Sequence, residues 1–265
     1  MTATAVTEER PSNRSMARMA SIIRYDSKPA LKDPFFIEAL PGIGNVGKVA
    51  GDFIADSVKA VKFASIYSED LPPQVNLDED SVIDMARNEL WYGKVGDRDV
   101  IFLRGEFQGS TPEGQYYLAQ DVMKELLKMD VRKIITLGGY GTGAMVDEPR
   151  VLGAVSDKRL KEDLSEYGVV FSPNDPQAGI IGAAGLLIGF GKIYGIDSVC
   201  LMGETSGFFV DHKSAKAIVD ILMKMFDVKL DTKDLEEKAG QIDELTAKVK
   251  EAEDQDTHED LSYIG

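Results

Sequence analysis

A glycine-rich segment, Gly42-Ile43-Gly44-Asn45-Val46-Gly47, is the first stretch whose residue types and spacing could perform chemistry. It matches G-x-G-x-x-G, follows an apolar strand-like run and opens a helical pattern, as a dinucleotide-binding turn does. There, amides at the helix N-terminus would bind a phosphate, and an acid after the second strand, here Glu69, would bind the ribose. A tight turn with close helix–sheet packing explains the same glycines, and both interpretations stay open.

A second glycine loop, Gly138-Gly139-Tyr140-Gly141-Thr142-Gly143, follows the apolar run Lys133–Leu137. It lacks the Lys-Ser/Thr pair of a P-loop, which excludes a Walker-type site. The loop suits either close backbone packing or an anion-binding nest. A third run, Gly179 to Gly185, spaces small residues three apart and predicts a helix pressed against a sheet or a partner subunit.

Glu204 and Thr205 come directly after the apolar run Ser198–Met202. Ligands of open α/β sheets bind at the carboxyl ends of the strands, so Glu204 is the best candidate for a general acid or base. A capping or turn role is the alternative for this pair.

The usual nucleophile and metal arrangements are missing from the sequence. Ser206 and His212 lie six residues apart in one loop, which is a poor spacing for a hydrolase relay. Cys200 lies inside an apolar run and is expected in the core. No group of His, Cys, Asp and Glu has metal-ligand spacing. We therefore expect no catalytic residue, no cofactor and no metal.

The net charge of −15 makes nucleic acid an improbable partner. The charge is uneven, because residues 230–265 contain twelve acids and four bases. The single cysteine excludes an internal disulfide and fits a reducing compartment. The first 21 residues do not resemble a secretory signal, and no apolar run reaches about 18 residues, the length of a membrane span. These features predict a soluble, cytoplasmic protein.

Apolar strands near residues 35, 63, 101, 134 and 199 alternate with helical patterns at 46–58, 111–128, 157–167, 181–194 and 214–226. A short strand is also expected at 169–171. The stretch 61–103 looks antiparallel, whereas 133–137 lacks alternation and predicts a strand buried on both faces. This order predicts an α/β fold, a three-layer sandwich with a largely parallel or mixed central sheet.

Four segments are expected along the chain. Residues 1–21 are predicted to be a disordered extension, and 22–228 the α/β domain. Residues 229–252 carry rough heptads, which suit a short coiled coil or a helix packed on its own domain. Residues 253–265 form an acidic linker that ends in an apolar tail.

The ordered glycine segments, with Leu40-Pro41 before the first and Leu201-Met202-Gly203-Glu204-Thr205 as the last, resemble the proteasome assembly chaperone family. The match covers about residues 22–228 and is to the archaeal branch, often labelled ATP-grasp-like. The resemblance implies a nucleoside phosphorylase-like fold and a homo-oligomeric, non-catalytic chaperone that binds proteasome α-subunits.

Archaeal members of that family have C-termini similar to the tails of proteasome activators, which end in a hydrophobic residue, Tyr and any residue. Here Tyr263 is third from the end and Ser262 occupies the hydrophobic place. The resemblance implies partner contacts by Leu261, Tyr263, Ile264 and the carboxylate of Gly265. The alternative hypothesis is an enzyme that holds a phosphate or nucleotide in the glycine loops.

Overall fold

The computed structural model describes residues 20–172, 179–242 and 244. Within them, eight strands form one sheet in the order β1-β3-β6-β7-β2-β8-β10-β9. The strands are β1 (Ile22–Tyr25), β2 (Phe35–Ala39), β3 (Val61–Tyr67), β6 (Asn88–Val95), β7 (Arg98–Gly105), β8 (Lys133–Gly141), β9 (Val151–Val155) and β10 (Asp197–Thr205). A separate two-stranded hairpin consists of β4 (Val75–Leu77) and β5 (Ile83–Met85). The helices are α1 (Val46–Ser57), α2 (Pro112–Lys128), α3 (Lys161–Glu166), α4 (Ala183–Tyr194) and α5 (His212–Phe226), with 3-10 turns at Ile43–Asn45 and Lys158–Leu160.

The centre of the sheet is parallel and its margins are antiparallel. Strands β7, β2, β8 and β10 run in one direction. Strands β6, β3 and β1 extend one side through antiparallel pairs, and β9 closes the other edge against β10. The mixed sheet and its antiparallel 61–103 region confirm the prediction.

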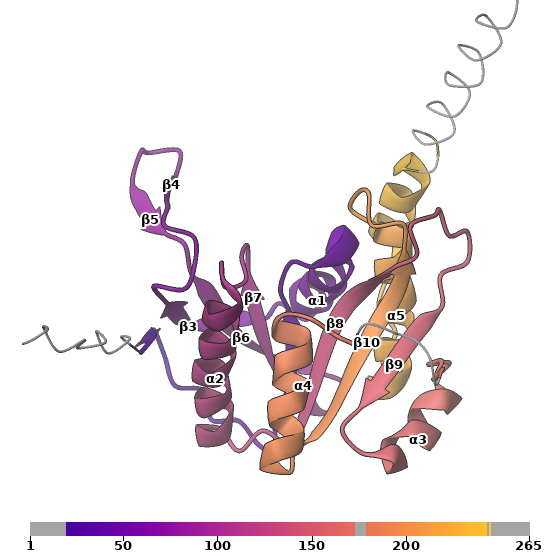
Figure 1. Cartoon of the computed structure of the whole chain (residues 1–265), viewed down its shortest axis with the longest axis horizontal. Coiled ribbons are helices and arrows are strands. Elements are labelled where there is room, and N and C mark those ends of the chain that lie inside the picture. Colours follow the sequence, from indigo (N-terminus) through magenta and orange to yellow (C-terminus); the bar gives the residue numbers. More distant parts are fainter. Residues whose placement is uncertain (1–19, 173–178, 243, 245–265) are drawn as a thin grey trace, which may run out of the picture.

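Helices cover both faces of the sheet, so the fold has three layers (Figure 1). Helices α1 and α5 pack together on one face, and α2 and α4 on the other. Alternate residues of β2 serve the two cores: Ile37 points toward α1 and α5, and Phe36 toward α2 and α4. The predicted three-layer α/β sandwich is therefore confirmed.

Local sequence signals explain where the helices begin. The Thr111 hydroxyl accepts a hydrogen bond from the Gly114 amide at 2.9 Å, and Pro112 occupies the first turn of α2. Asp211 caps α5 in the same way, by accepting from the Ser214 amide at 2.9 Å. The sheet and these caps fix where the loops at the carboxyl edge lie.

Several elements differ from the predicted ones. The helix expected at 157–167 is a 3-10 turn followed by α3, because Asp157 caps a short turn first. The strand expected at 169–171 is a single bridge, between Leu152 and Val170. Strand β9 and the hairpin β4–β5 are additional to the predicted elements. Each of these strands has at most five residues, too few for a periodic pattern.

Residues 233–242 are helical and pack on the same domain. Leu235 is only 2% exposed and belongs to the core beside α1 and α5. Most of the predicted N-terminal extension and the whole apolar tail lie outside the described residues. Within the described residues, no helix has both the length and the apolar character needed to cross a membrane.

Candidate functional site at the carboxyl edge of the sheet

The first glycine segment forms the turn between β2 and α1. Gly44 has φ of 61°, and a Cβ there would lie 2.8 Å from the Thr205 hydroxyl. A Cβ on Gly47 would lie 2.3 Å from the Leu137 carbonyl oxygen, on strand β8. Both distances are shorter than real Cβ contacts. The glycines thus let α1 press directly onto the backbone of the central sheet.

The second glycine loop packs against the first. A Cβ on Gly139 would lie 2.2 Å from the Ile43 carbonyl oxygen, whereas Gly138 and Gly141 have room at 3.8 and 3.6 Å. The structure therefore brings Gly42, Gly44, Asn45, Gly47, Gly138, Gly139, Gly141, Gly143, Glu204 and Thr205 to one edge of the sheet. At Gly44, the atoms that a Cβ would overlap belong to the Thr205 side chain, and at Gly47 and Gly139 they belong to protein backbone.

Glu204 is held in an ion pair at this edge. Its carboxylate accepts hydrogen bonds from the Arg150 guanidinium, at 2.9 Å from Nε, and from the Arg150 amide at 3.1 Å. These bonds lower the pKa of Glu204 against the opposing effect of burial. An ionised carboxylate with both oxygens bound to Arg150 is a poor general base, because its proton affinity is low.

A small cavity beside the edge is lined by Ser206, Asp211 and His212, among others. Its volume of about 10 Å³ accommodates roughly one water molecule. In the described part of the chain, the Ser206 hydroxyl bonds to the Phe208 amide and not to His212. Burial lowers the pKa of His212. The cavity is too small to hold a nucleotide.

Cys200 lies in the core, as predicted. It is fully buried, and desolvation raises the pKa of its thiol to about 12. A protonated, enclosed thiol is not a nucleophile. Within residues 20–172, 179–242 and 244, no group of His, Cys, Asp and Glu is arranged to hold a metal ion.

Exposed apolar side chains occupy the loops of the edge, and sequence reasoning missed them. Phe208 is 75% exposed, Ile181 84% and Ile43 52%. A Cβ on Gly207 would lie 3.2 Å from Ile43, so the loops carrying Ile43 and Phe208 are in contact. Exposed apolar loops on a rigid scaffold suit contact with another protein better than acid–base chemistry.

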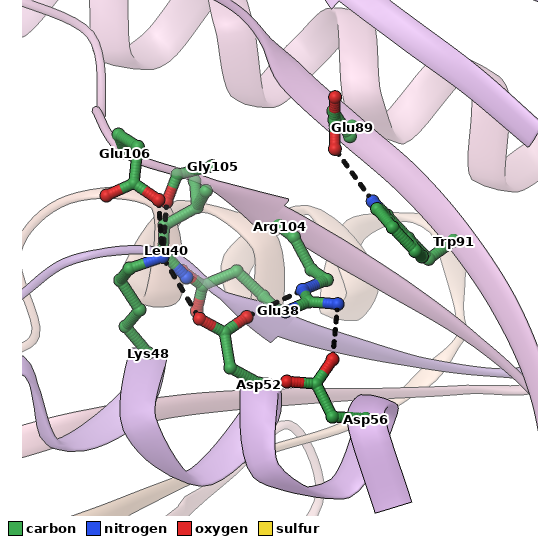
Figure 2. Close-up of polar contacts among 10 residues, drawn as sticks. All are labelled: Glu38, Leu40, Lys48, Asp52, Asp56, Glu89, Trp91, Arg104, Gly105 and Glu106. Atoms are coloured by element: carbon green, nitrogen blue, oxygen red, sulfur yellow. Dashed lines mark hydrogen bonds and ion pairs between the residues drawn. The ribbon is translucent and has the colours of Figure 1, made fainter. Parts of the chain in front are cut away.

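A charged cleft of about 550 Å³ lies between α1, the ends of β6 and β7, and the hairpin β4–β5. Asp52 joins two of its cations, accepting from Lys48 at 3.0 Å and from Arg104 at 2.7 Å (Figure 2). Arg104 also donates to Asp56, and Lys48 to Glu106. Burial alone would lower the pKa of Lys48, but its bonds to Glu106 and Asp52 outweigh this and raise it.

The same cleft contains the only tryptophan of the sequence, Trp91. Its indole N–H donates to Glu89 at 2.9 Å, and the Arg104 guanidinium lies 4.8 Å from the ring centroid. The charges pair with one another, so the arrangement is a network that joins α1 to the sheet. The acids and cations of the cleft are thus taken up by structural ion pairs.

Glu38 is a deeply buried carboxyl on β2, just before the first glycine turn. It is 1% exposed, and its Oε1 accepts from the Leu40 amide at 3.0 Å. Desolvation raises its pKa to about 8, although the backbone amides of Leu40 and Leu137 oppose the rise. No pattern in the sequence marks this residue, because a glutamate in a short strand has no distinctive spacing.

The tail residues Leu261, Tyr263, Ile264 and Gly265 lie outside the described residues. Their contacts with a partner therefore stay a prediction.

A family model described as the PAC2 family matches residues 36–250. The chain belongs to the PAC2 family. The matched span contains every glycine loop of the carboxyl edge and the charged cleft. Membership confirms the resemblance to proteasome assembly chaperones that the glycine segments indicated.

Individual relatives and solved structures align over most of the chain. An uncharacterised protein of Methanocaldococcus jannaschii is 34% identical over 89% of this chain and 93% of its own. Pyrococcus furiosus PbaB, described as an archaeal proteasome activator, is 36% identical with a TM-score of 0.81, over 87% of this chain and 99% of its own. P. furiosus PbaA, described as an archaeal homologue of a proteasome-assembly chaperone, has a TM-score of 0.73 at 23% identity, over 91% of this chain and 99% of its own. At that identity the PbaA match shows a shared fold alone.

Proposed function

We propose that this PAC2 family member is a non-catalytic, homo-oligomeric chaperone or adaptor that binds proteasome α-subunits. The observation that carries the proposal is the 36% identity to P. furiosus PbaB, a proteasome activator, across 99% of that chain. The carboxyl edge adds physical support. Its glycines accommodate backbone, its best acid is paired with arginine, and its loops carry the exposed apolar side chains of Ile43, Ile181 and Phe208.

The tail is proposed as the docking peptide. It would present Leu261, Tyr263, Ile264 and the Gly265 carboxylate on an acidic linker of the chain. A short peptide with one aromatic anchor binds a preformed groove without a large entropic cost. Tyr263 is third from the end, whereas the Tyr of activator tails is second. We therefore propose that Tyr263 acts as an aromatic anchor, without assuming that the tail binds in the same register as an activator tail.

Binding to assembled α-subunits tests the proposal. We expect the purified full-length chain to co-elute with α-subunit rings of the same organism in size-exclusion chromatography. The free chain should elute later, because its mass is far smaller. Separate elution at every concentration and ionic strength tried would contradict the proposal.

A phosphate- or nucleotide-binding enzyme is the alternative that the glycine loops raised. The alternative predicts stabilisation by mass action, about 2.7 kcal/mol at a hundredfold excess over Kd. We expect ATP, ADP and inorganic phosphate at millimolar concentration to leave the melting temperature unchanged in a thermal-shift assay. A shift of several degrees with one of them would favour the alternative.

A further inference from the structure

A pocket of about 210 Å³ lies where strands β1 and β3 meet the base of the hairpin β4–β5, beside the charged cleft. In the antiparallel pair of β1 and β3, Arg24 lies directly opposite Ser65, so their side chains share one face of the sheet. Ala64 and Ile66 point into the core under α2 and α4, which places Ser65 on the opposite face. The residues that line the pocket are Arg24, Asp26, Lys62, Ser65, Tyr67, Asp84 and Arg87.

Three of these side chains have donor groups without a partner in the described part of the chain. The Arg24 guanidinium forms no ion pair or hydrogen bond there, and the hydroxyls of Ser65 and Tyr67 form no hydrogen bond. Ser65 is only 3% exposed, and a polar side chain that is so deeply buried normally has a partner. The pocket that Ser65 lines is therefore the place where an acceptor for its hydroxyl would lie.

The other charges of the pocket are engaged with one another. Arg87 forms ion pairs with Asp84 of β5 and with Glu89 of β6, the latter at 2.7 Å. The Lys62 ammonium lies 3.6 Å from Asp26 and 3.7 Å from Glu89. These two distances are too long for hydrogen bonds, so the ammonium adds a further set of N–H donors that a ligand could use. The cation that remains without an ion pair among the described residues is the arginine of β1.

A group of donors of this kind suits a carboxylate. Arginine and lysine can only donate, and an ionised carboxylate can only accept, through two oxygens with about four lone-pair positions. The planar fork of an arginine matches both oxygens of a carboxylate at once. Asp26 and Asp84 line the same pocket and repel an anion with two charges, so a carboxylate fits better than a sulfate-like group. The volume is below the range of about 300–1,000 Å³ that drug-sized ligands occupy, which also favours a small group.

We propose that this pocket binds a carboxylate, with the Arg24 guanidinium and the hydroxyls of Ser65 and Tyr67 donating to its two oxygens. A free carboxylic acid and an acidic side chain of a peptide present the same group, and that group is what the pocket recognises. The inference does not rest on binding to the proteasome, because it follows from the donors of β1 and β3 alone.

An NMR titration of the isotope-labelled, full-length chain with sodium acetate at neutral pH tests the proposal. We expect acetate to shift the amide signals of β1 and β3 in a saturable way in the millimolar range, whereas sodium chloride at matched ionic strength should not. Sodium sulfate is the comparison anion with two charges, and it should bind more weakly than acetate. The α-amide of N-acetyl-aspartic acid represents the acidic side chain of a peptide. Binding of both carboxylates assigns the site to the carboxylate alone, and binding of the aspartate derivative alone assigns it to peptides.

Two variants test the donors. Arg24→Gln should weaken binding of the carboxylate at least tenfold, because glutamine lacks both the charge and the fork of arginine. Ser65→Ala should weaken it about threefold and leave the melting temperature unchanged, because the hydroxyl has no described partner to lose in the empty pocket. Arg132→Gln is the matched control, because it removes the same charge from an arginine that is 68% exposed and lies before β8. It should bind like the wild type.

Three results would each overturn the proposal. The first is the absence of a saturable shift with either carboxylate. The second is binding that both Arg24→Gln and Ser65→Ala leave intact, which would place the site elsewhere. The third is sulfate binding that is tighter than acetate binding. Circular dichroism spectra equal to that of the wild type confirm that the variants are folded, and Ser65→Ala alone decides the second result if Arg24→Gln does not fold.

Discussion

Gly47→Ala should destabilise the chain by about 1–3 kcal/mol, the cost of overpacking a well-packed core. A Cβ at this position would lie 2.3 Å from the carbonyl oxygen and 2.5 Å from the carbonyl carbon of Leu137. Both atoms are backbone of β8, in the middle of the sheet, so neither can rotate away. The helix α1 would have to move off the sheet, and its contacts with the core would loosen.

Intrinsic helix propensity predicts the opposite sign for this substitution. Alanine in a helix is favoured over glycine by up to about 1 kcal/mol. Urea denaturation at neutral pH decides between the two effects, with Gly42→Ala as the matched control. Gly42 has φ of −152°, and no atom lies within 4 Å of the place that its Cβ would take, so this substitution should change little. A Gly47→Ala protein as stable as the wild type would refute the packing role of this glycine.

Glu38→Gln should make the stability of the chain less dependent on pH between about 5 and 8. The Glu38 carboxyl has a pKa raised from 4.5 to about 8 in the folded chain. The folded state therefore holds a proton that the unfolded state has released throughout this range. The stabilisation from that proton is complete below pH 4.5 and is lost as the pH rises through about 8.

The size of the effect follows from the slope of about 1.4 kcal/mol per pH unit for one proton. Glutamine has a similar shape and stays neutral. We compare the free energy of unfolding of the variant with that of the wild type at each pH. The difference, variant minus wild type, should increase by on the order of 2–4 kcal/mol between pH 5.5 and 8.5. Urea denaturation at several pH values measures this. The control is Glu79→Gln, at the exposed hairpin tip, whose stability should vary with pH as that of the wild type does. If the stability of Glu38→Gln also varied with pH in parallel with the wild type, Glu38 would already be ionised in the folded chain.

Much of the domain could be predicted from hydrophobic pattern and capping residues. The run Lys133–Leu137 lacks alternation because β8 is buried on both faces, and Thr111-Pro112 marks the start of α2 because these residues satisfy a helix N-terminus. The hairpin β4–β5 could not be predicted, because its three-residue strands lie among prolines and acids. Its amphipathic character depends on a register that only the folded chain shows.

The position of the candidate site could be predicted, but its chemistry could not. The glycine segments point to the carboxyl edge of the sheet, and the structure places them there. The partner of Glu204 is invisible in the sequence, because Arg150 is 54 residues away. The same holds for the charged cleft, where Asp52 meets Arg104 across 52 residues. Which charged residues pair at such separations depends on the order of the strands in the folded sheet, and the sequence pattern does not show that order.

These features together favour a protein that acts through its surfaces. The glycines are explained by contacts with backbone, the acid at the edge is paired, and the apolar side chains of the edge loops and the hairpin are exposed. The proposed partner rests on the 36% sequence identity to PbaB, which is described as an archaeal proteasome activator.

The most direct test of this account is a binding titration of proteasome α-subunit rings with the full-length chain and with a chain that ends at Asp260. Both chains should have the same melting temperature and the same mass in solution. The account predicts saturable binding of the full-length chain and at least a hundredfold weaker binding of the shortened one, a loss of about 2.7 kcal/mol or more. Equal affinity of the two chains, or no binding by either, would contradict it.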